Sequence, residues 1–465
     1  MKKRIFSCIM ALTMTATVLV GCGAYKKADE LPEWNPSEEF RFAAYMTPPQ
    51  ANVGSGVLRG NPNYITREKW KDVADCGFNY AYAVYEYETK DIATVLDYCE
   101  EFGIKYIARD YGGASASLGG LVGDGKTPLT ITEDQKNTIK SRIDLYKDSP
   151  AFAGHLVYDE PNAQQFDNIA AVKDFYEEYL PDKEFFVNLL PDSTATGTDT
   201  YGEYLDEFIG KVKPEFLSYD RYALTYDTTK NPDLAIGYIK NLEDVAVRAK
   251  EHGIPFYVYL LTMGHWNYRT PKNYDDLAWQ IYNSMAYGAR GLETFTYWTT
   301  MSTGENITYG LVDWYGNKTQ TWYSMQQLIA EIKAMQNAYM SFDWQNTVCY
   351  TADADFPNYQ YDSLAESVLC DGKAVSPIEG VDEMSADRDM LLGHFKDEAG
   401  RNGYMLTNMS DPAYDRTATA EIKFADADEV IVYKKGRTAR YALKKGVFRT
   451  QVGSGEGQFI VPITK

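Results

Sequence analysis

The chain has 465 residues, which allows one large and one smaller domain, and its 45% hydrophobic and 14% aromatic content is ample for packed cores. Asp and Glu number 66 against 46 Lys and Arg, so the formal net charge is −20. This excess of negative charge argues against nucleic-acid binding, against an electrostatic hold on anionic lipid, and against strongly anionic substrates.

The N-terminus is typical of a bacterial export signal. A basic start at residues 2–4 precedes a mostly apolar stretch over residues 5–20, and Gly21 and Cys22 follow. This ending resembles a lipobox, which implies cleavage before Cys22 and lipidation of its thiol. We therefore expect a lipoprotein signal peptide over 1–21, a polar tether over 22–38, and a location outside the cytoplasm. The lipid at Cys22 would be the only membrane contact, because no later stretch has the roughly 20 apolar residues that span a bilayer. An ordinary signal peptide with a chance cysteine is the alternative.

From residue 39 onward, short apolar runs alternate with helical patterns. This alternation indicates parallel βαβ units, and eight of them in about 300 residues fit a (β/α)8 TIM barrel over 39–342. A doubly wound open sheet is the alternative, but no GxGxxG or GxxxxGK[ST] motif follows the first strand. The expected strands are Phe40–Met46, Phe78–Tyr85, Lys105–Tyr111, Phe152–Asp159, Glu184–Leu190, Phe216–Tyr222, Pro255–Thr262 and Gly291–Trp298. The expected helices lie near 66–76, 89–102, 132–148, 163–180, 203–212, 233–252, 272–288 and 319–340.

The pattern changes near residue 345, where helical periodicity stops and short alternating runs begin. Turn residues separate these runs, which predicts a small antiparallel β-sandwich domain over 345–465. We expect this domain to support the barrel by packing. The expected strands are Met390–Phe395, Tyr404–Asn408, Ala418–Phe424, Val430–Tyr433, Ala439–Leu443 and Phe459–Ile463.

Cysteine usage does not indicate a metal centre. No cysteine belongs to a CxxC pair and the chain has only four histidines, so neither a zinc site nor any other metal site is expected. Cys76 and Cys99 lie near the ends of two consecutive predicted helices. A disulfide between them is one interpretation, and buried free thiols are the one we favour.

Polar and aromatic side chains follow the ends of the predicted strands, where catalytic groups of TIM barrels lie. Aromatic rings stack on the apolar faces of sugars, and fixed polar groups bind their hydroxyls, so this set of side chains favours a sugar site. The residues concerned are Tyr45, Tyr85, Glu86, Arg109, Asp110, Asp159, Glu160, Asn188, Asp220, Arg221, Tyr222, His265, Trp266, Tyr297 and Trp298.

Glu160 is the strongest candidate for a catalytic group. It follows an apolar run and Asp159, and Pro161 then ends the strand. A Glu at this rim beside a second acid suits general acid/base chemistry. The alternative is that Asp159 and Glu160 only cap the next helix.

Other rim residues also have structural interpretations. Asp220 and Arg221 are equally consistent with an ion pair, and His265 with loop packing. Trp298 is either a ligand platform or core. A stripe of helical spacing is expected to be core, namely Trp279, Ile281, Tyr282, Met285 and Ala286.

Three stretches resemble the clan A glycoside hydrolases, in particular bacterial beta-galactosidase-like barrels with a trailing β-sandwich. Tyr158–Pro161 stands where that clan has its fourth-strand Asn-Glu-Pro acid/base motif. Ala286–Trp298 looks like the last helix-to-strand passage, which ends in the Trp that floors the sugar subsite. Gly393–Phe459 is similar to the C-terminal sandwich of many sugar-cleaving enzymes. The resemblance implies a glycoside hydrolase that acts on a neutral glycan or oligosaccharide and needs no cofactor.

The chain departs from that clan at two positions. Asp159 replaces the Asn that contacts the sugar 2-hydroxyl, and a nearby Asp159 charge would raise the pKa of Glu160. The clan's nucleophile is a Glu at the end of the seventh strand, and no acid is present there in this chain. Candidates for the second carboxylate are Asp220, then Glu293, which lies deep in the barrel, and then Glu305 in the loop after the eighth strand.

With Glu160 as proton donor, the resemblance leaves three mechanisms open. A retaining enzyme would take its nucleophile from an unusual position, whereas an inverting enzyme would use Asp220 as base. A degenerate barrel would bind glycans at the cell surface without cleaving them. In each case the expected sugar platform is Tyr222, Trp266, Tyr297 and Trp298, and the expected polar contacts are Asp110, Asp159, Asn188 and His265.

Overall fold

The computed structural model describes residues 25–26, 32–51, 61–82, 89–109, 116–235, 237–300, 307–351, 368–371 and 378–463. The predicted signal peptide and Cys22 lie outside these residues, as do Tyr85, Glu86, Asp110 and Glu305. Within the described part of the chain, no helix is both long and apolar enough to cross a membrane.

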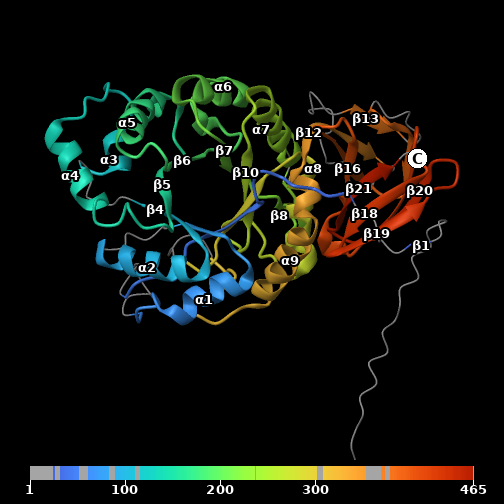
Figure 1. Cartoon of the computed structure of the whole chain (residues 1–465), viewed down its shortest axis with the longest axis horizontal. Helices are drawn as coiled ribbons and strands as arrows, with labels where there is room; N and C mark the ends of the chain where they lie inside the picture. The colour runs from blue at the N-terminus through green and yellow to red at the C-terminus, as the bar shows by residue number, and fades with distance from the viewer. Residues whose placement is uncertain are drawn as a thin grey trace, which may run out of the picture.

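Eight parallel strands close into a barrel, with helices around it (Figure 1). Each predicted strand is present, and each overlaps its expected range. The fold class predicted from alternation is therefore confirmed. The strands are β2 (Arg41–Tyr45), β3 (Tyr80–Tyr82), β4 (Lys105–Ala108), β5 (Phe152–Asp159), β6 (Glu184–Leu189), β7 (Leu217–Asp220), β10 (Phe256–Leu261) and β11 (Gly291–Phe295).

The helices follow from amphipathic patterns and from capping residues. Thr132 and Gln135 form a capping box, and Gly253 ends a helix in the left-handed conformation. Cys76 and Cys99 are buried free thiols, as expected. The helices are α1 (Arg67–Cys76), α2 (Thr89–Phe102), α3 (Leu118–Val122), α4 (Glu133–Ile143), α5 (Phe166–Tyr179), α6 (Tyr201–Val212), α7 (Tyr238–His252), α8 (Tyr274–Ala286) and α9 (Gln320–Met340). A hairpin of β8 (Leu224–Tyr226) and β9 (Pro232–Leu234) follows β7.

The C-terminal part forms two antiparallel-rich sheets around a second apolar core, as the prediction of a β-sandwich requires. The larger sheet contains β1 (Tyr25–Lys26), β12 (Phe342–Thr351), β13 (Val368–Asp371), β15 (Met390–Asp397), β16 (Asn402–Asn408), β18 (Glu429–Lys434), β19 (Arg437–Ala442) and β21 (Gly457–Ile463). The smaller sheet contains β14 (Val381–Ala386), β17 (Ala418–Phe424) and β20 (Val447–Val452).

Helix α8 lies between the barrel and the sandwich and contacts both (Figure 1). It is buried on nearly all sides. Its predicted apolar stripe is core, as expected. The large sheet approaches this helix so closely that a Cβ atom at Gly393 would lie 2.0 Å from the Ala286 carbonyl oxygen. Trp279 also donates from Nε1 to the Met409 carbonyl at 3.2 Å. One apolar core therefore runs from the barrel into the sandwich.

Part of the segment predicted to be a tether packs against the folded chain. Trp34 is buried, and its indole donates to the Tyr433 hydroxyl at 2.9 Å. The backbone of residues 25–26 pairs with β19. Composition alone predicted a polar tether here, but Trp34 has an apolar site beside Phe342.

Candidate active site

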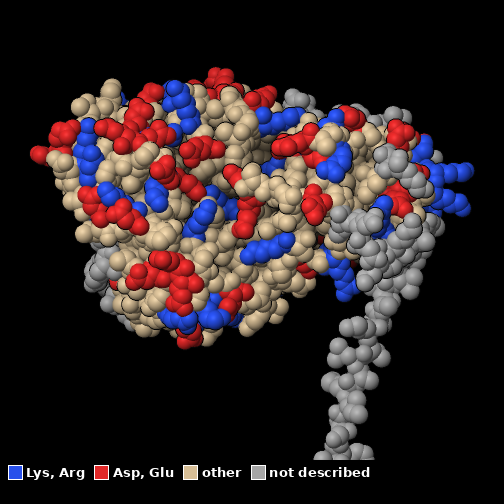
Figure 2. Space-filling model, viewed as in Figure 1, with Lys and Arg blue, Asp and Glu red and all other residues tan. Residues whose placement is uncertain are grey.

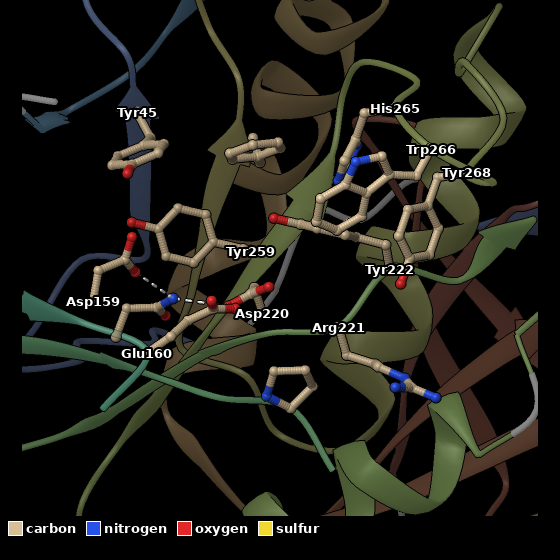
Figure 3. A pocket seen from close by; sticks show the side chains of 13 residues that line it. Tyr45, Asp159, Glu160, Asp220, Arg221, Tyr222, Tyr259, His265, Trp266 and Tyr268 are labelled. Carbon is tan, nitrogen blue, oxygen red and sulfur yellow. Dashed lines mark hydrogen bonds between the residues drawn. The ribbon is translucent and has the colours of Figure 1, made fainter. Parts of the chain in front are cut away.

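An open cavity of about 250 Å³ lies at the carboxyl ends of the barrel strands. Figure 3 shows acids on one side of this pocket and aromatic rings on the other. Eight predicted rim residues line it together with Glu160, namely Tyr45, Asp159, Asn188, Asp220, Arg221, Tyr222, His265 and Trp266. Pro191, Tyr259, Tyr268 and Phe295 complete the lining.

The turn after β5 places Glu160 in the pocket. Glu160 has a left-handed backbone conformation with φ of 52°, which a non-glycine residue adopts only when its surroundings enforce it. Its backbone amide donates to the Asn188 carbonyl at 2.9 Å, which fixes the turn. Asn162, with Gln165 in a capping box, caps the short helix that follows. Glu160 is therefore not needed as a helix cap.

Asn188 holds two carboxylates beside Glu160. Its Nδ2 donates to Asp159 Oδ1 at 3.1 Å and to Asp220 Oδ1 at 2.8 Å. Figure 3 shows these two hydrogen bonds across the acidic side of the pocket. The amide is thus committed to positioning acids.

Asp220 and Glu160 form a hydrogen-bonded carboxyl pair. Burial raises the pKa of Glu160, and the Asp159 charge raises it further, as the sequence predicted. Burial also raises the pKa of Asp220, and the charges of Glu160 and Asp159 add to this increase. Two carboxyls in contact cannot both ionise readily, so each disfavours the ionisation of the other.

The aromatic side of the pocket consists of rings packed on one another. Tyr222 stacks on Phe295 at 5.6 Å between ring centroids, and Tyr45 meets Tyr259 edge to face at 5.3 Å. Trp266, whose φ is 49°, is 65% exposed at the pocket mouth. The site therefore offers a buried aromatic wall and one projecting indole.

His265 lies in the pocket wall. Its ring centroid is 5.6 Å from that of Tyr222, 5.1 Å from that of Tyr268 and 5.2 Å from that of Phe295. It therefore has both of the roles considered from the sequence, loop packing and pocket lining.

Glu293 lies one layer below the pocket, inside the barrel. It is fully buried and accepts hydrogen bonds from the Tyr82 hydroxyl and Ser218 Oγ, each at 2.7 Å. Because side chains two residues apart on a strand share a face, Phe295 covers Glu293 from the pocket side. Glu293 is therefore not placed to contact a ligand in the pocket, in contrast to its predicted role as second carboxylate.

A hydrogen-bond chain links Glu293 to the pocket. Ser218 Oγ lies 2.7 Å from Glu293 and 3.1 Å from Asn188 Oδ1, and its single proton can serve only one of them. The chain is complete when Glu293 is protonated and donates to Ser218, which then donates to Asn188. Burial raises the pKa of Glu293 to about 7, in agreement with this arrangement.

Tyr297 and Trp298 are not part of the pocket. Both are fully buried behind it, with Tyr297 packed edge to face on Phe78 and Trp298 on Tyr64. The prediction that they form the sugar platform is therefore wrong for the described structure. The reason is local: β11 ends at Phe295, and the chain then turns away from the rim.

Four residues of the pocket were not expected from the sequence, namely Pro191, Tyr259, Tyr268 and Phe295. Tyr259 and Phe295 lie within apolar strands and so resemble core positions. The alternation of side chains along a strand is the signal for the two strand residues. Tyr259 lies on the same face of its strand as Tyr257, and Phe295 lies on the same face as Glu293. Among the described residues, no group of three or more His, Cys, Asp or Glu is arranged to hold a metal ion.

Residues 159–335 match the model of glycoside hydrolase family 42, which is described as beta-galactosidase. The chain is similar to the beta-galactosidases of clan A. The resemblance expected from the sequence is thereby confirmed, and the matched segment begins at Asp159. No match was found among the curated proteins.

Three solved beta-galactosidases are similar in structure to this chain. That of Bacillus circulans sp. alkalophilus is 9% identical, with a TM-score of 0.52, and the match covers 91% of this chain and 99% of that one. That of Halorubrum lacusprofundi is 9% identical with the same coverage and a TM-score of 0.49. That of Marinomonas ef1 is 10% identical, covers 72% of this chain and 70% of that one, and has a TM-score of 0.48. At this identity the first similarity establishes the fold alone.

Proposed function

We propose that this protein hydrolyses glycosidic bonds in a neutral glycan or oligosaccharide, with Glu160 as the proton donor. The observation that carries the proposal is the hydrogen-bonded pair of Glu160 and Asp220 at the carboxyl ends of the barrel strands. A raised pKa favours the protonated form of the pair, and the open pocket lets Glu160 deliver the proton to a leaving oxygen.

The rest of the pocket supports a sugar ligand. Tyr222 and the exposed Trp266 offer faces for the apolar side of a sugar ring, and Asp159 offers oxygen acceptors for its polar groups. Acidic side chains predominate on the face seen in Figure 2, consistent with a neutral rather than an anionic substrate.

The test is product release from a panel of neutral glycans by the chain starting after Cys22. Glu160→Gln removes the proton and keeps the shape, and Glu178→Gln is the matched control, because Glu178 is exposed on α5. The proposal predicts turnover by the parent and by the Glu178 variant and loss of turnover in the Glu160 variant.

One observation favours a second function, that of a glycan-binding protein without activity. No acid occurs between His252 and Asp275, which removes any carboxylate from β10 and the loop that follows it. Such a protein would bind a glycan saturably, would release no product, and would keep its affinity in the Glu160→Gln variant.

The location of the protein is also a proposal. The basic start, the apolar stretch and Cys22 support lipid anchoring outside the cytoplasm. Incorporation of a labelled fatty acid by the parent, and its loss in Cys22→Ala, would support this proposal. Equal labelling of the two chains would contradict it.

A further inference from the structure

Among the described residues, the site provides a proton donor but no carboxylate on the opposite side of a bound sugar. β10 and the following loop contain no acid, and Glu293 is buried one layer below. Asp220 touches Glu160, whereas the two carboxyls of a glycosidase stand about 5 Å apart in retaining enzymes and farther apart in inverting ones. Apart from Glu160 itself, none of the described carboxyls is therefore placed as a nucleophile, or as a base for water on the side opposite Glu160.

The site does provide a second acid directly beside the proton donor. Asp159 precedes Glu160 in the chain, lines the same pocket, and is held by Asn188 at 3.1 Å. Because Asp159 and Glu160 line the same pocket, a sugar whose C1 oxygen meets Glu160 would bring its C2 substituent toward Asp159. A carboxylate can accept a hydrogen bond from an N–H group at that position and can also stabilise a positive charge that develops there.

The aromatic wall next to Asp159 suits a small acyl group. Tyr45, Tyr259 and Phe295 are packed together and largely buried, so they offer an apolar surface of methyl-group scale. The Tyr259 hydroxyl points toward the Asp159 carboxylate in Figure 3 and can donate to a carbonyl oxygen held between them. An N–H acceptor, an O–H donor and an apolar surface together match an acetamido group.

We propose that the substrates are glycosides of 2-acetamido-2-deoxy sugars, and that the acetamido oxygen of the sugar is the nucleophile. This inference rests on the proposed glycosidase function. The acetamido oxygen bonds to C1 as the C1–O bond breaks, and Glu160 gives its proton to the departing oxygen. The cyclic cation that results is balanced by the Asp159 carboxylate.

The second half of the reaction restores both sugar and protein. Water attacks C1 from the side that the leaving group vacated, gives one proton to Glu160, and releases the acetamido oxygen. The net change is addition of water across the glycosidic bond, with retention at C1. Tethering the nucleophile to the sugar provides the effective concentration that a protein nucleophile would otherwise supply.

The test compares matched 4-nitrophenyl glycosides that differ only at C2, with a hydroxyl in one series and an acetamido group in the other. Both the gluco and the galacto forms are used. We expect hydrolysis of the acetamido series at least about 100-fold faster, and a steep fall in kcat as the acetyl group is replaced by mono-, di- and trifluoroacetyl. Asp159→Asn should lower kcat about 100-fold while thermal melting stays unchanged.

The outcomes separate the two proposals. Hydrolysis of the hydroxyl series at an equal or greater rate, or insensitivity of kcat to fluorination, would overturn the acetamido mechanism and leave the glycosidase standing. Absence of turnover in both series, by folded protein that also releases nothing from the glycan panel, would overturn both. A sulfur-containing cyclic analogue of the intermediate should inhibit the acetamido hydrolysis far more strongly than the free sugar does.

Discussion

The loop that carries the aromatic half of the pocket is fastened to the sandwich by a buried ion pair. Arg269, three residues after Trp266, pairs with Asp411 of the C-terminal domain and lies 3.5 Å from Asp276 at the start of α8. The three side chains are 1–7% exposed. Removal of Asp411 would leave the buried Arg269 guanidinium with Asp276 as its one remaining acidic partner in this cluster, at 3.5 Å.

The expected loss in Asp411→Ala follows from this geometry. Removing one partner of a buried pair costs about 3–5 kcal/mol, and the remaining Asp276 places this variant at the lower end of that range. Asp411 Oδ1 also accepts from the Ala413 amide at 2.9 Å, a local cap that contributes about 1 kcal/mol. The free energy of unfolding should therefore fall by about 3–4 kcal/mol, which lowers Tm by roughly 3–4 °C for a chain of this length.

Thermal melting followed by circular dichroism measures this loss, and Asp75→Ala is the control. Asp75 forms an exposed pair with Lys71 on α1, so its removal should change stability by less than about 0.5 kcal/mol. In a glycosidase assay, KM should rise in Asp411→Ala and stay constant in the control, since the loop with His265 and Trp266 loses its support. Equal melting of the two variants would refute the reasoning.

Three further predictions concern the core and the rim. Glu293 has an ordinary pKa of 4.5 and a folded pKa of about 7, so the native state retains a proton that the unfolded chain has released between these values. The free energy of unfolding therefore decreases as pH rises through this window, by a total on the order of 3 kcal/mol. In urea unfolding, the stability of Glu293→Gln relative to the parent should increase from pH 5 to pH 8. A constant difference between the two proteins over this range would contradict this. Trp266→Ala should raise KM roughly fivefold, for a stacking loss of about 1 kcal/mol, with Tm unchanged; an unchanged KM would exclude stacking. Burial raises the pKa of the Cys76 and Cys99 thiols, so Ellman's reagent should react with neither until the chain is unfolded, and fast reaction in the native protein would show an open core.

The barrel was predictable because each strand is a short apolar run between helices with recognisable ends. The start of the sandwich was harder to predict. β12 begins at Phe342, two residues after α9 ends at Met340, so no change of composition marks the boundary. The predicted polar segment before the barrel also contains Trp34, whose burial depends on Tyr433 and Phe342 nearly 400 and about 300 residues away.

The acidic half of the site was predictable from sequence, and the aromatic half was predicted only in part. Asp159, Glu160, Asn188 and Asp220 stand at strand ends, where topology brings them together. Whether Trp298 lies in the pocket or in the core depends on where β11 ends, and the apolar sequence of this strand does not indicate that position. The contact of Glu160 with Asp220, which depends on the left-handed turn at Glu160, also has no signal in the spacing of these residues.

The central claim is that Glu160 donates the proton to the leaving group. Its most direct test is the dependence of kcat/KM, which reports cleavage of the glycosidic bond, on the leaving group in the parent and in Glu160→Gln. If Glu160 is the donor, kcat/KM of the variant should fall little on dinitrophenyl glycosides, whose leaving group needs no proton, and at least about 100-fold on alkyl or sugar leaving groups. An equal loss on both classes of substrate would contradict the claim, because it would show that Glu160 acts on the sugar rather than on the leaving oxygen.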